Sequence, residues 1–314
     1  MSDKISLRQA FGEELALLGE KYSKLQVVAA GTSNSDGSQL FGKKFSDRFW
    51  NVGISEPNAV ALATGMAMAG NPVVIADMAI FYTMAYAQLI TAARQTRIHL
   101  IVAASHTGLG VGQDGGSAQD ITDIGRMRLI PGFTIATPWD GDMVRETLRE
   151  MLGNPGLYYL RLNRSDLPLF SKAYGASREP LCSQTIKLSG QLGVTVVTYG
   201  DMVYPVLQAV PEYSGESDPV YVDLFGLTTV EPLKTEEIFR SLAATGRLLV
   251  VENHMAAGGV GEMLVSLALQ AGLEFQFRLA ALPREFGTSG KSEELFKLYG
   301  LDQGSLARQI LSFS

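Results

Sequence analysis

The sequence has 314 residues, 46% of them hydrophobic and 18% charged, with a formal net charge of -6. This length predicts two domains of ordinary size, each able to bury a core without disulfides or structural metals. The negative charge argues against nucleic acid as a partner, because proteins that bind a phosphate backbone gather Lys and Arg on one face. The single cysteine, Cys182, cannot form an internal disulfide, which fits a reducing, cytoplasmic setting.

The first residues, MSDKISLRQAFGEELALL, do not join a basic segment to an apolar core. The sequence also lacks an uncharged apolar stretch of about 18 residues, the minimum for a membrane-spanning helix. We therefore expect neither export nor a membrane partner.

The first half of the chain alternates helix-like and strand-like segments. Ser6 and Gln9 resemble a capping box ahead of apolar residues at helical spacing, which predicts an amphipathic helix at the start. Apolar runs predict strands buried on both faces at 25–31, 72–76, 97–104 and 133–136. Helices are predicted between them at 57–70, 84–94 and 140–152. This alternation is typical of the α/β class, with a mostly parallel sheet flanked by helices.

The periodic pattern loosens after Asp166 into prolines and serines, which predicts a linker at 171–190. Beyond it, strand-like segments and a terminal helix predict a second, smaller α/β domain; they lie at 194–199, 220–224, 248–252 and 292–299. The expected domains are therefore 1–170 and 191–314.

The segment NVGISEPNAVALATGMAMAG places Glu56 just before a proline and a helix of small residues. A glutamate there is more often a helix cap or a first-turn charge than a catalytic group. The segment resembles the pyrimidine-binding domain of the transketolase family, in which a glutamate hydrogen-bonds the aminopyrimidine ring of thiamine diphosphate. The resemblance implies that Glu56 is this cofactor-binding and catalytic carboxylate, which holds a proton on the ring nitrogen.

Met78, Phe81 and Met84 recur three residues apart, with Tyr86 nearby, a pattern usual for an apolar helix face. In transketolases and deoxyxylulose-phosphate synthases an aromatic residue at this place stacks on the aminopyrimidine, and Phe81 matches it. The resemblance implies that all four residues contact the cofactor. Met84 departs from the basic residue found in part of the family.

The stretch SHTGLGVGQDGGSAQD carries glycines in the spacing of a dinucleotide fingerprint, but its strand and helix are about fourteen residues apart, too far for that motif. It resembles the transketolase active-site loop, which carries a histidine, an aspartate and a second histidine. The resemblance implies that His106 is an acid/base and substrate-binding residue and that Asp114 binds substrate. Ala118 stands in place of the second histidine, which suggests a changed substrate or a histidine supplied by a partner.

The segment YYLRLNRSDLP resembles the family strand whose arginine binds the substrate phosphate. Arg164 is the better match, and Arg161 lies on the same face if the strand continues, so either can serve or form a structural salt bridge. Ser35 aligns with a family serine that touches the same phosphate. Gly31 replaces the aspartate usual at the head of that motif.

The segments VTVVTYGDMV, LLVVENHMAAGGVGE and EFGTSGKSEELFKLYGLD resemble the transketolase C-terminal domain, so the resemblance covers nearly the whole chain. We expect structural roles for His99, Glu252 and His254. The G-D-G motif that holds the diphosphate through a divalent ion such as Mg²⁺ is absent, so no metal ligand is expected here. The resemblance implies a partner subunit that binds the diphosphate and the ion, in a heterotetramer of two copies of each chain.

The resemblance implies a subunit of a split transketolase, which transfers a two-carbon ketol unit between phosphorylated ketose and aldose sugars. One alternative is the E1 beta subunit of a 2-oxoacid dehydrogenase, which has the same two domains and also lacks the diphosphate domain. Another is a catalytically silent transketolase-like interaction protein, which Ala118 and Gly31 leave open.

Overall fold

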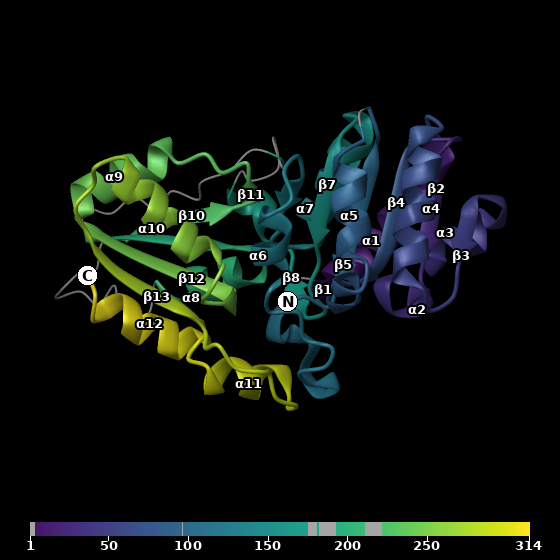
Figure 1. Ribbon diagram of the computed structural model, residues 1–314. Helices are drawn as coiled ribbons and strands as arrows, with labels where there is room; N and C mark the ends of the chain where they lie inside the picture. Colours follow the sequence, from purple (N-terminus) through teal and green to yellow (C-terminus); the bar gives the residue numbers. More distant parts are fainter. Residues whose placement is uncertain (1–3, 96, 175–180, 182–192, 211–221) are drawn as a thin grey trace.

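The computed structural model describes residues 4–95, 97–174, 181, 193–210 and 222–314. It has two main sheets, each flanked by helices (Figure 1), which confirms the predicted α/β class. Most of the predicted linker lies outside the described residues. Within these ranges, every helix is too short or too polar to cross a membrane.

The larger sheet has the strand order β11-β6-β7-β5-β4-β2-β3 among the described residues. All neighbours pair in parallel except β11, which pairs antiparallel with β6. The strands are β2 (Gln26–Ala29), β3 (Phe49–Asn51), β4 (Val73–Met78), β5 (Leu100–Ser105), β6 (Thr134–Ala136), β7 (Leu157–Arg161) and β11 (Thr229–Glu231). The predicted strands correspond to β2, β4, β5 and β6, whose apolar side chains are almost all buried because helices cover both faces of the sheet.

The longer helices of this half are α1 (Leu7–Lys21), α4 (Glu56–Met68), α5 (Tyr86–Ala93) and α7 (Gly141–Gly153). Ser6 is the N-cap residue of α1, and its side chain accepts a hydrogen bond from the Gln9 main-chain nitrogen at 3.3 Å. The capping box is only half formed, because the Gln9 side chain bonds Glu13 instead of reaching back. Shorter segments are α2 (Ser33–Asp36), α3 (Gln39–Lys44), α6 (Asp123–Arg128), η1 (Ser46–Arg48), η2 (Ala79–Thr83) and η3 (Gly108–Asp114).

The smaller sheet is parallel, with the order β10-β9-β12-β13. Its strands are β9 (Val194–Tyr199), β10 (Val222–Leu227), β12 (Arg247–Met255) and β13 (Gln276–Leu282). Its helices are η5 (Gly200–Met202), α8 (Val203–Ala209), α9 (Glu236–Thr245), α10 (Val260–Gln270), α11 (Ser292–Leu298) and α12 (Gln303–Leu311). A separate antiparallel pair, β1 (Lys4–Ser6) with β8 (Asp166–Pro168), ties the start of the chain to the end of the first half; η4 (Ser171–Tyr174) follows it.

The two halves are joined through strand β11. This strand follows β10 in the chain but adds to the edge of the larger sheet, beside β6 (Figure 1). The buried Trp139 of the first half donates from Nε1 to the Leu227 carbonyl oxygen of the second at 2.8 Å. One hydrophobic cluster also contains residues of both sheets, including Tyr159 and Val250. The halves are therefore packed as one body.

Candidate active site

Five loops bring polar side chains to one edge of the larger sheet. In a parallel sheet the carboxyl ends of the strands meet at the same edge, where ligands usually bind. Here β2 leads to Thr32 and Ser35, β4 ends beside Asp77, β5 leads to His106, β3 leads to Glu56, and β7 leads to Arg164. Asp77 and Thr32 were not predicted as site residues.

Glu56 is the first residue of α4, with Pro57 in the next position. The positive end of the helix dipole favours a carboxylate at this place. Its side chain is 9% exposed, and among the described residues none donates a hydrogen bond to its carboxylate. Burial is the main cause that raises the pKa of Asp77 on β4, and the negative charge of Glu56 adds a smaller contribution. A carboxylate without a partner remains able to bond a ligand.

The predicted cofactor-contact residues fall into two groups. Met78 and Phe81 are partly buried at the end of β4 and in η2, and Met84 is 69% exposed. Tyr86 is partly buried as well: it packs against the main hydrophobic cluster and its hydroxyl donates to the Arg126 carbonyl oxygen at 3.0 Å. These contacts favour a structural role for Tyr86, while Met78, Phe81 and Met84 lack such a hydrogen bond from their side chains among the described residues.

His106 follows β5 with a backbone φ of 61°, in the left-handed region that non-glycine residues seldom adopt. Its side chain is 2% exposed, and its Nδ1 lies 2.8 Å from the Ser105 hydroxyl oxygen. Burial, together with the charges of Arg8 and Arg164, lowers the pKa of His106 to about 4. His106 is therefore neutral at pH 7 and can offer one nitrogen as a donor and the other as an acceptor.

The arginine of α1, Arg8, was missed by the sequence reasoning. Its Nη1 donates to the Ser35 carbonyl oxygen at 2.6 Å, and a polar cavity of about 260 Å³ is lined by both residues. Burial and the charge of Arg164 lower the pKa of Arg8, which indicates that the two cations lie near each other. The sequence shows Arg8 only as a polar residue in the first turn of a helix. Its position depends on the pairing of β1 with β8, which local sequence does not reveal.

Arg164 and Asp114 form an ion pair, with Nη1 and Oδ2 2.5 Å apart, and both side chains are open to solvent. Arg164 also donates to the Val111 carbonyl oxygen at 3.3 Å, so it lies against the glycine-rich loop. Arg164, Asp114 and His106 are thus brought together. Ala118 is buried in the same loop.

The structure corrects the expectation for Arg161. Its side chain is only 3% exposed, its Nε donates to Asp123 Oδ2 at 2.8 Å, and its Nη2 donates to the Asn253 carbonyl oxygen at 2.9 Å. Asp201 Oδ1 lies 3.7 Å from Nη1. Strand β7 ends at Arg161, so Arg161 faces the second half of the chain while Arg164 lies in the following loop. Arg161 joins the two halves and is not available to a substrate.

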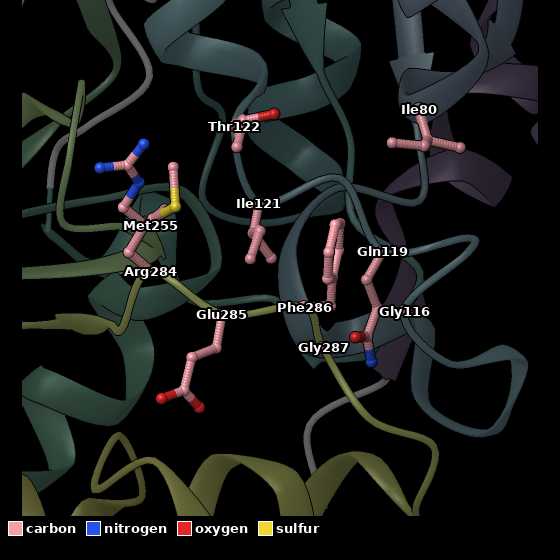
Figure 2. Close-up of a pocket in the computed structure, with 10 residues that line it drawn as sticks. All are labelled: Ile80, Gly116, Gln119, Ile121, Thr122, Met255, Arg284, Glu285, Phe286 and Gly287. Atoms are coloured by element: carbon pink, nitrogen blue, oxygen red, sulfur yellow. The ribbon is translucent and has the colours of Figure 1, made fainter.

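A larger cavity of about 380 Å³ lies between the halves (Figure 2). Ile80 of η2 and the loop after η3 contribute one side, and the segment after β13 contributes the other. Phe286 of that segment is almost fully exposed. Ile80 directly precedes Phe81, so this cavity adjoins the candidate cofactor face. In the described part of the chain, no three His, Cys, Asp or Glu side chains gather where they could hold a metal ion.

Comparison with known families agrees with this architecture. A model of the transketolase pyrimidine-binding domain matches residues 3–169, and a model of the transketolase C-terminal domain matches residues 185–306. The chain therefore belongs to the transketolase family, whose members depend on thiamine diphosphate.

Among individual proteins, the chain is similar to a transketolase C-terminal section from Methanocaldococcus jannaschii, with 29% identity over 97% of this chain and 95% of that protein. It is 29% identical to human transketolase over 99% of this chain but only 49% of that enzyme, so it spans about half of a full-length relative. A solved structure described as a split-gene transketolase, "inactive beta4 tetramer", superimposes with a TM-score of 0.85 at 25% identity, covering 98% of each chain.

Proposed function

We propose that this chain is the pyrimidine-binding subunit of a split transketolase, which transfers a two-carbon ketol unit between anionic ketose and aldose sugars. The observation that carries the proposal is the carboxylate of Glu56, which stands at a helix N-terminus without a hydrogen-bond partner among the described residues, at the same sheet edge as His106. In this proposal, 1–170 is the pyrimidine-binding domain and 191–314 the C-terminal domain, joined by a linker at 171–190.

The residues at this edge fit the aminopyrimidine end of thiamine diphosphate. When bound, the cofactor supplies the nucleophilic carbon that breaks and forms the carbon–carbon bond. Glu56 would hold a proton at the ring nitrogen, and Phe81 offers a partly exposed aromatic face for the ring. Met78 and Met84 would pack around them. Among the described residues, no cluster of His, Cys, Asp or Glu side chains could hold the metal ion that a diphosphate needs.

The other end of the site fits an anionic sugar. Arg8 and Arg164 are permanently charged and lie close enough to affect the same histidine, His106. Guanidinium groups bind phosphate oxygens in pairs, and the Ser35 segment, held by Arg8, lines the adjoining cavity. Neutral His106 can then bond a sugar hydroxyl or carbonyl. Asp114 holds Arg164 in place until the anion arrives.

The proposal requires a second polypeptide. The chain spans about half of the full-length relatives, and a partner would bind the diphosphate and a divalent ion such as Mg²⁺. Ile54 is 91% exposed on the segment before Glu56, and Met84 is 69% exposed beyond Phe81. Apolar side chains this open, beside the candidate site, suit burial against a partner. We propose a heterotetramer of two copies of each chain, working in the cytoplasm.

The test is Glu56→Gln in the complex reconstituted with the partner subunit. Gln keeps the size of the side chain but cannot exchange a proton, so turnover of a phosphorylated ketose with an aldose acceptor is expected to fall by roughly 10²–10⁴-fold or more. The melting temperature of the isolated chain should stay unchanged. The matched control is Glu236→Gln, which alters an exposed first-turn glutamate of α9 and should leave turnover intact.

Equal turnover of the Glu56→Gln and wild-type complexes would contradict the proposal and favour a silent interaction protein. Turnover of a 2-oxoacid but not of a ketose would favour the E1 beta alternative. The isolated chain should be inactive, as the similar split-gene transketolase tetramer is described to be. Turnover by the isolated chain would remove the need for a partner.

A further inference from the structure

Two buried carboxyl groups share one hydroxyl at the back of the candidate site. The Thr32 Oγ1 atom lies 2.5 Å from Asp77 Oδ1 and 3.1 Å from Asp36 Oδ2. Asp77 is fully buried and Asp36 is 1% exposed. The three residues come from the β2–α2 loop, the end of α2 and the end of β4, and we name them the Asp36–Thr32–Asp77 bridge.

A hydroxyl has one hydrogen, so it makes one well-aligned hydrogen bond at a time. If both aspartates were ionised, that hydrogen would serve two buried carboxylates, and the longer contact, to Asp36, would have little hydrogen-bond character. One added proton removes this conflict. Either Asp36 donates to Thr32 while Thr32 donates to Asp77, or the chain of donors runs the other way.

The remaining contacts are consistent with both directions. The Ser38 main-chain nitrogen donates to Asp36 Oδ1 and the Met78 nitrogen donates to Asp77 Oδ1, each at 2.7 Å. Asp77 Oδ2 is buried with no hydrogen-bond partner in the described part of the chain, which is costly for a charged carboxylate. A proton on the bridge would relieve this cost and would give each contact of Thr32 its own hydrogen.

The charged groups around the bridge, together with its burial, also favour a bound proton. The carboxyl group of Asp77 faces Asp36 of α2, Glu56 of α4 and the buried Tyr82 of η2. On the neighbouring strand β5, the Ser105 hydroxyl donates to the Asp77 main-chain oxygen. Burial, with smaller contributions from Asp36 and Glu56, raises the pKa of Asp77 to about 7. Burial also raises the pKa of Asp36, although Arg8 of α1 opposes this.

We propose that Asp36 and Asp77 share a single proton through the Thr32 hydroxyl and act as a positioning pair behind Glu56. When the proton moves from Asp36 to the Thr32 oxygen, the hydrogen of Thr32 passes to Asp77, so the bridge carries one negative charge in either arrangement. The pair limits the charge beside Glu56 and keeps the α2 loop, with Ser35 and its bond to Arg8, in place. The positioning role rests on the proposed function, whereas the shared proton does not.

The proton can be detected without any activity, by infrared spectra of the folded full-length chain at pH 6. A protonated carboxyl gives a carbonyl band distinct from those of carboxylates, and a difference spectrum cancels every other acid. Asp36→Asn and Asp77→Asn each imitate one of the two arrangements, because the amide donates to Thr32 where the acid did. Sharing predicts that either single variant removes the same one-proton band, with Glu14→Gln, a buried carboxylate paired with Arg149, as the control that leaves the band unchanged.

Loss of the band in only one of the two variants would assign the proton to one residue and overturn the sharing. A difference spectrum that shows ionised carboxylates alone would overturn the proposal entirely. Thr32→Ser should keep the position of the band, and Thr32→Val should shift it toward a carboxyl without a hydrogen bond. An unshifted band in Thr32→Val would exclude the hydroxyl as the bridge.

In the reconstituted complex, the wild type should lose kcat/KM as the pH rises through about 7, and Asp36→Asn should flatten this limb of the profile. A profile of Asp36→Asn identical to that of the wild type would contradict the positioning role. Glu56→Gln separates the two proposals, since it should lower turnover as stated above but retain the infrared band. A complex that never turns over sugars would contradict the proposed function, but it would not contradict the shared proton.

Discussion

Arg161 and Arg164 illustrate how far the sequence can separate two similar residues. We expected both on one face of a continuing strand, and both resembled a phosphate ligand. That expectation was wrong in itself, because residues three positions apart on a strand point to opposite faces. The strand ends at Arg161, however, so the two guanidinium groups point to different surroundings. Arg161 is enclosed by Asp123, Asp201 and Asn253, all distant in sequence, and no local pattern could reveal those partners.

These surroundings predict opposite effects of the same substitution. Arg161→Leu leaves two buried aspartates without their cation and should lower the free energy of unfolding by about 3–5 kcal/mol. Arg164→Leu breaks a solvent-exposed ion pair, worth less than about 1 kcal/mol, and a long hydrogen bond to the Val111 carbonyl oxygen. It should raise KM for a phosphorylated sugar roughly tenfold or more, because a charged hydrogen bond to substrate is lost. Urea denaturation and steady-state kinetics separate the two, and equal losses of stability would contradict this assignment.

The histidine of the site predicts a pH dependence of stability. The pKa of His106 is lowered from 6.5 to about 4 on folding, so between these values the unfolded chain binds a proton that the folded chain does not. The contribution of His106 to the free energy of unfolding therefore falls as the pH decreases from 6.5 to 4. Relative to His106→Gln, the wild type should lose up to about 1.4 kcal/mol of stability per pH unit in this window. Denaturant titrations at pH 5 and 7.5 measure it; a difference that does not change with pH would argue against a buried neutral His106.

At the scale of elements, length decided what the sequence could predict. The long apolar strands and amphipathic helices were predictable because their patterns repeat over many residues. Strands β3, β8 and β11 have three residues each, too few to display a period, and each contains an acidic or amide residue that interrupts an apolar run. Strand β6 is equally short, but it lies in the apolar run at 133–136. They exist because a distant segment offers main-chain partners, as β6 does for β11 and β1 does for β8. The missed site residue Arg8 depends on one of these pairings.

Helix α10 shows how a side chain fixes an element. Glu252 at the end of β12 accepts hydrogen bonds from the Val260 and Gly261 nitrogens at the start of α10, and from the Tyr199 hydroxyl. A Cβ at position 259 would lie 2.5 Å from the Glu252 carboxylate, so glycine is needed there. The expected structural role of Glu252 is thus supported. His254 is likewise buried and bonded, through its Nε2, to the Gly125 nitrogen.

Glu252→Ala should therefore destabilise the chain by at least about 3 kcal/mol, because three buried donors lose their acceptor. Glu252→Gln retains one acceptor oxygen and should cost less. Thermal unfolding of the two variants provides the comparison, and equal melting temperatures for Glu252→Ala and the wild type would exclude this capping role.

On the scale of the whole molecule, the two halves share a sheet, a hydrophobic cluster and the buried contacts of Arg161. The sequence predicted two α/β domains, and their internal architecture follows from local patterns. Their union could not be predicted, since it depends on β11 leaving one half to pair with the other. A division at a single linker describes the order of the chain better than its packing.

This packing predicts one cooperative unfolding transition for the isolated chain. Differential scanning calorimetry should give a single peak, with calorimetric and van't Hoff enthalpies in agreement, because neither half keeps its full sheet or core without the other. Gly226→Val provides a targeted perturbation, since a Cβ atom there would lie 2.8 Å from the Trp139 ring. The variant should lower the melting temperature of the single transition. Two resolved peaks, with only one shifted by the variant, would contradict a single body.

The pairing of β11 with β6 also has a consequence for synthesis of the protein on the ribosome. A ribosome releases the segment of β6 well before it has translated Thr229–Glu231, so the nascent first sheet has an uncovered edge for that interval. Open edges readily pair with strands of neighbouring polypeptides. Newly synthesised chains are thus vulnerable to misassembly until their last third has emerged, and chaperone capture should be strongest on translation products that stop short of β11.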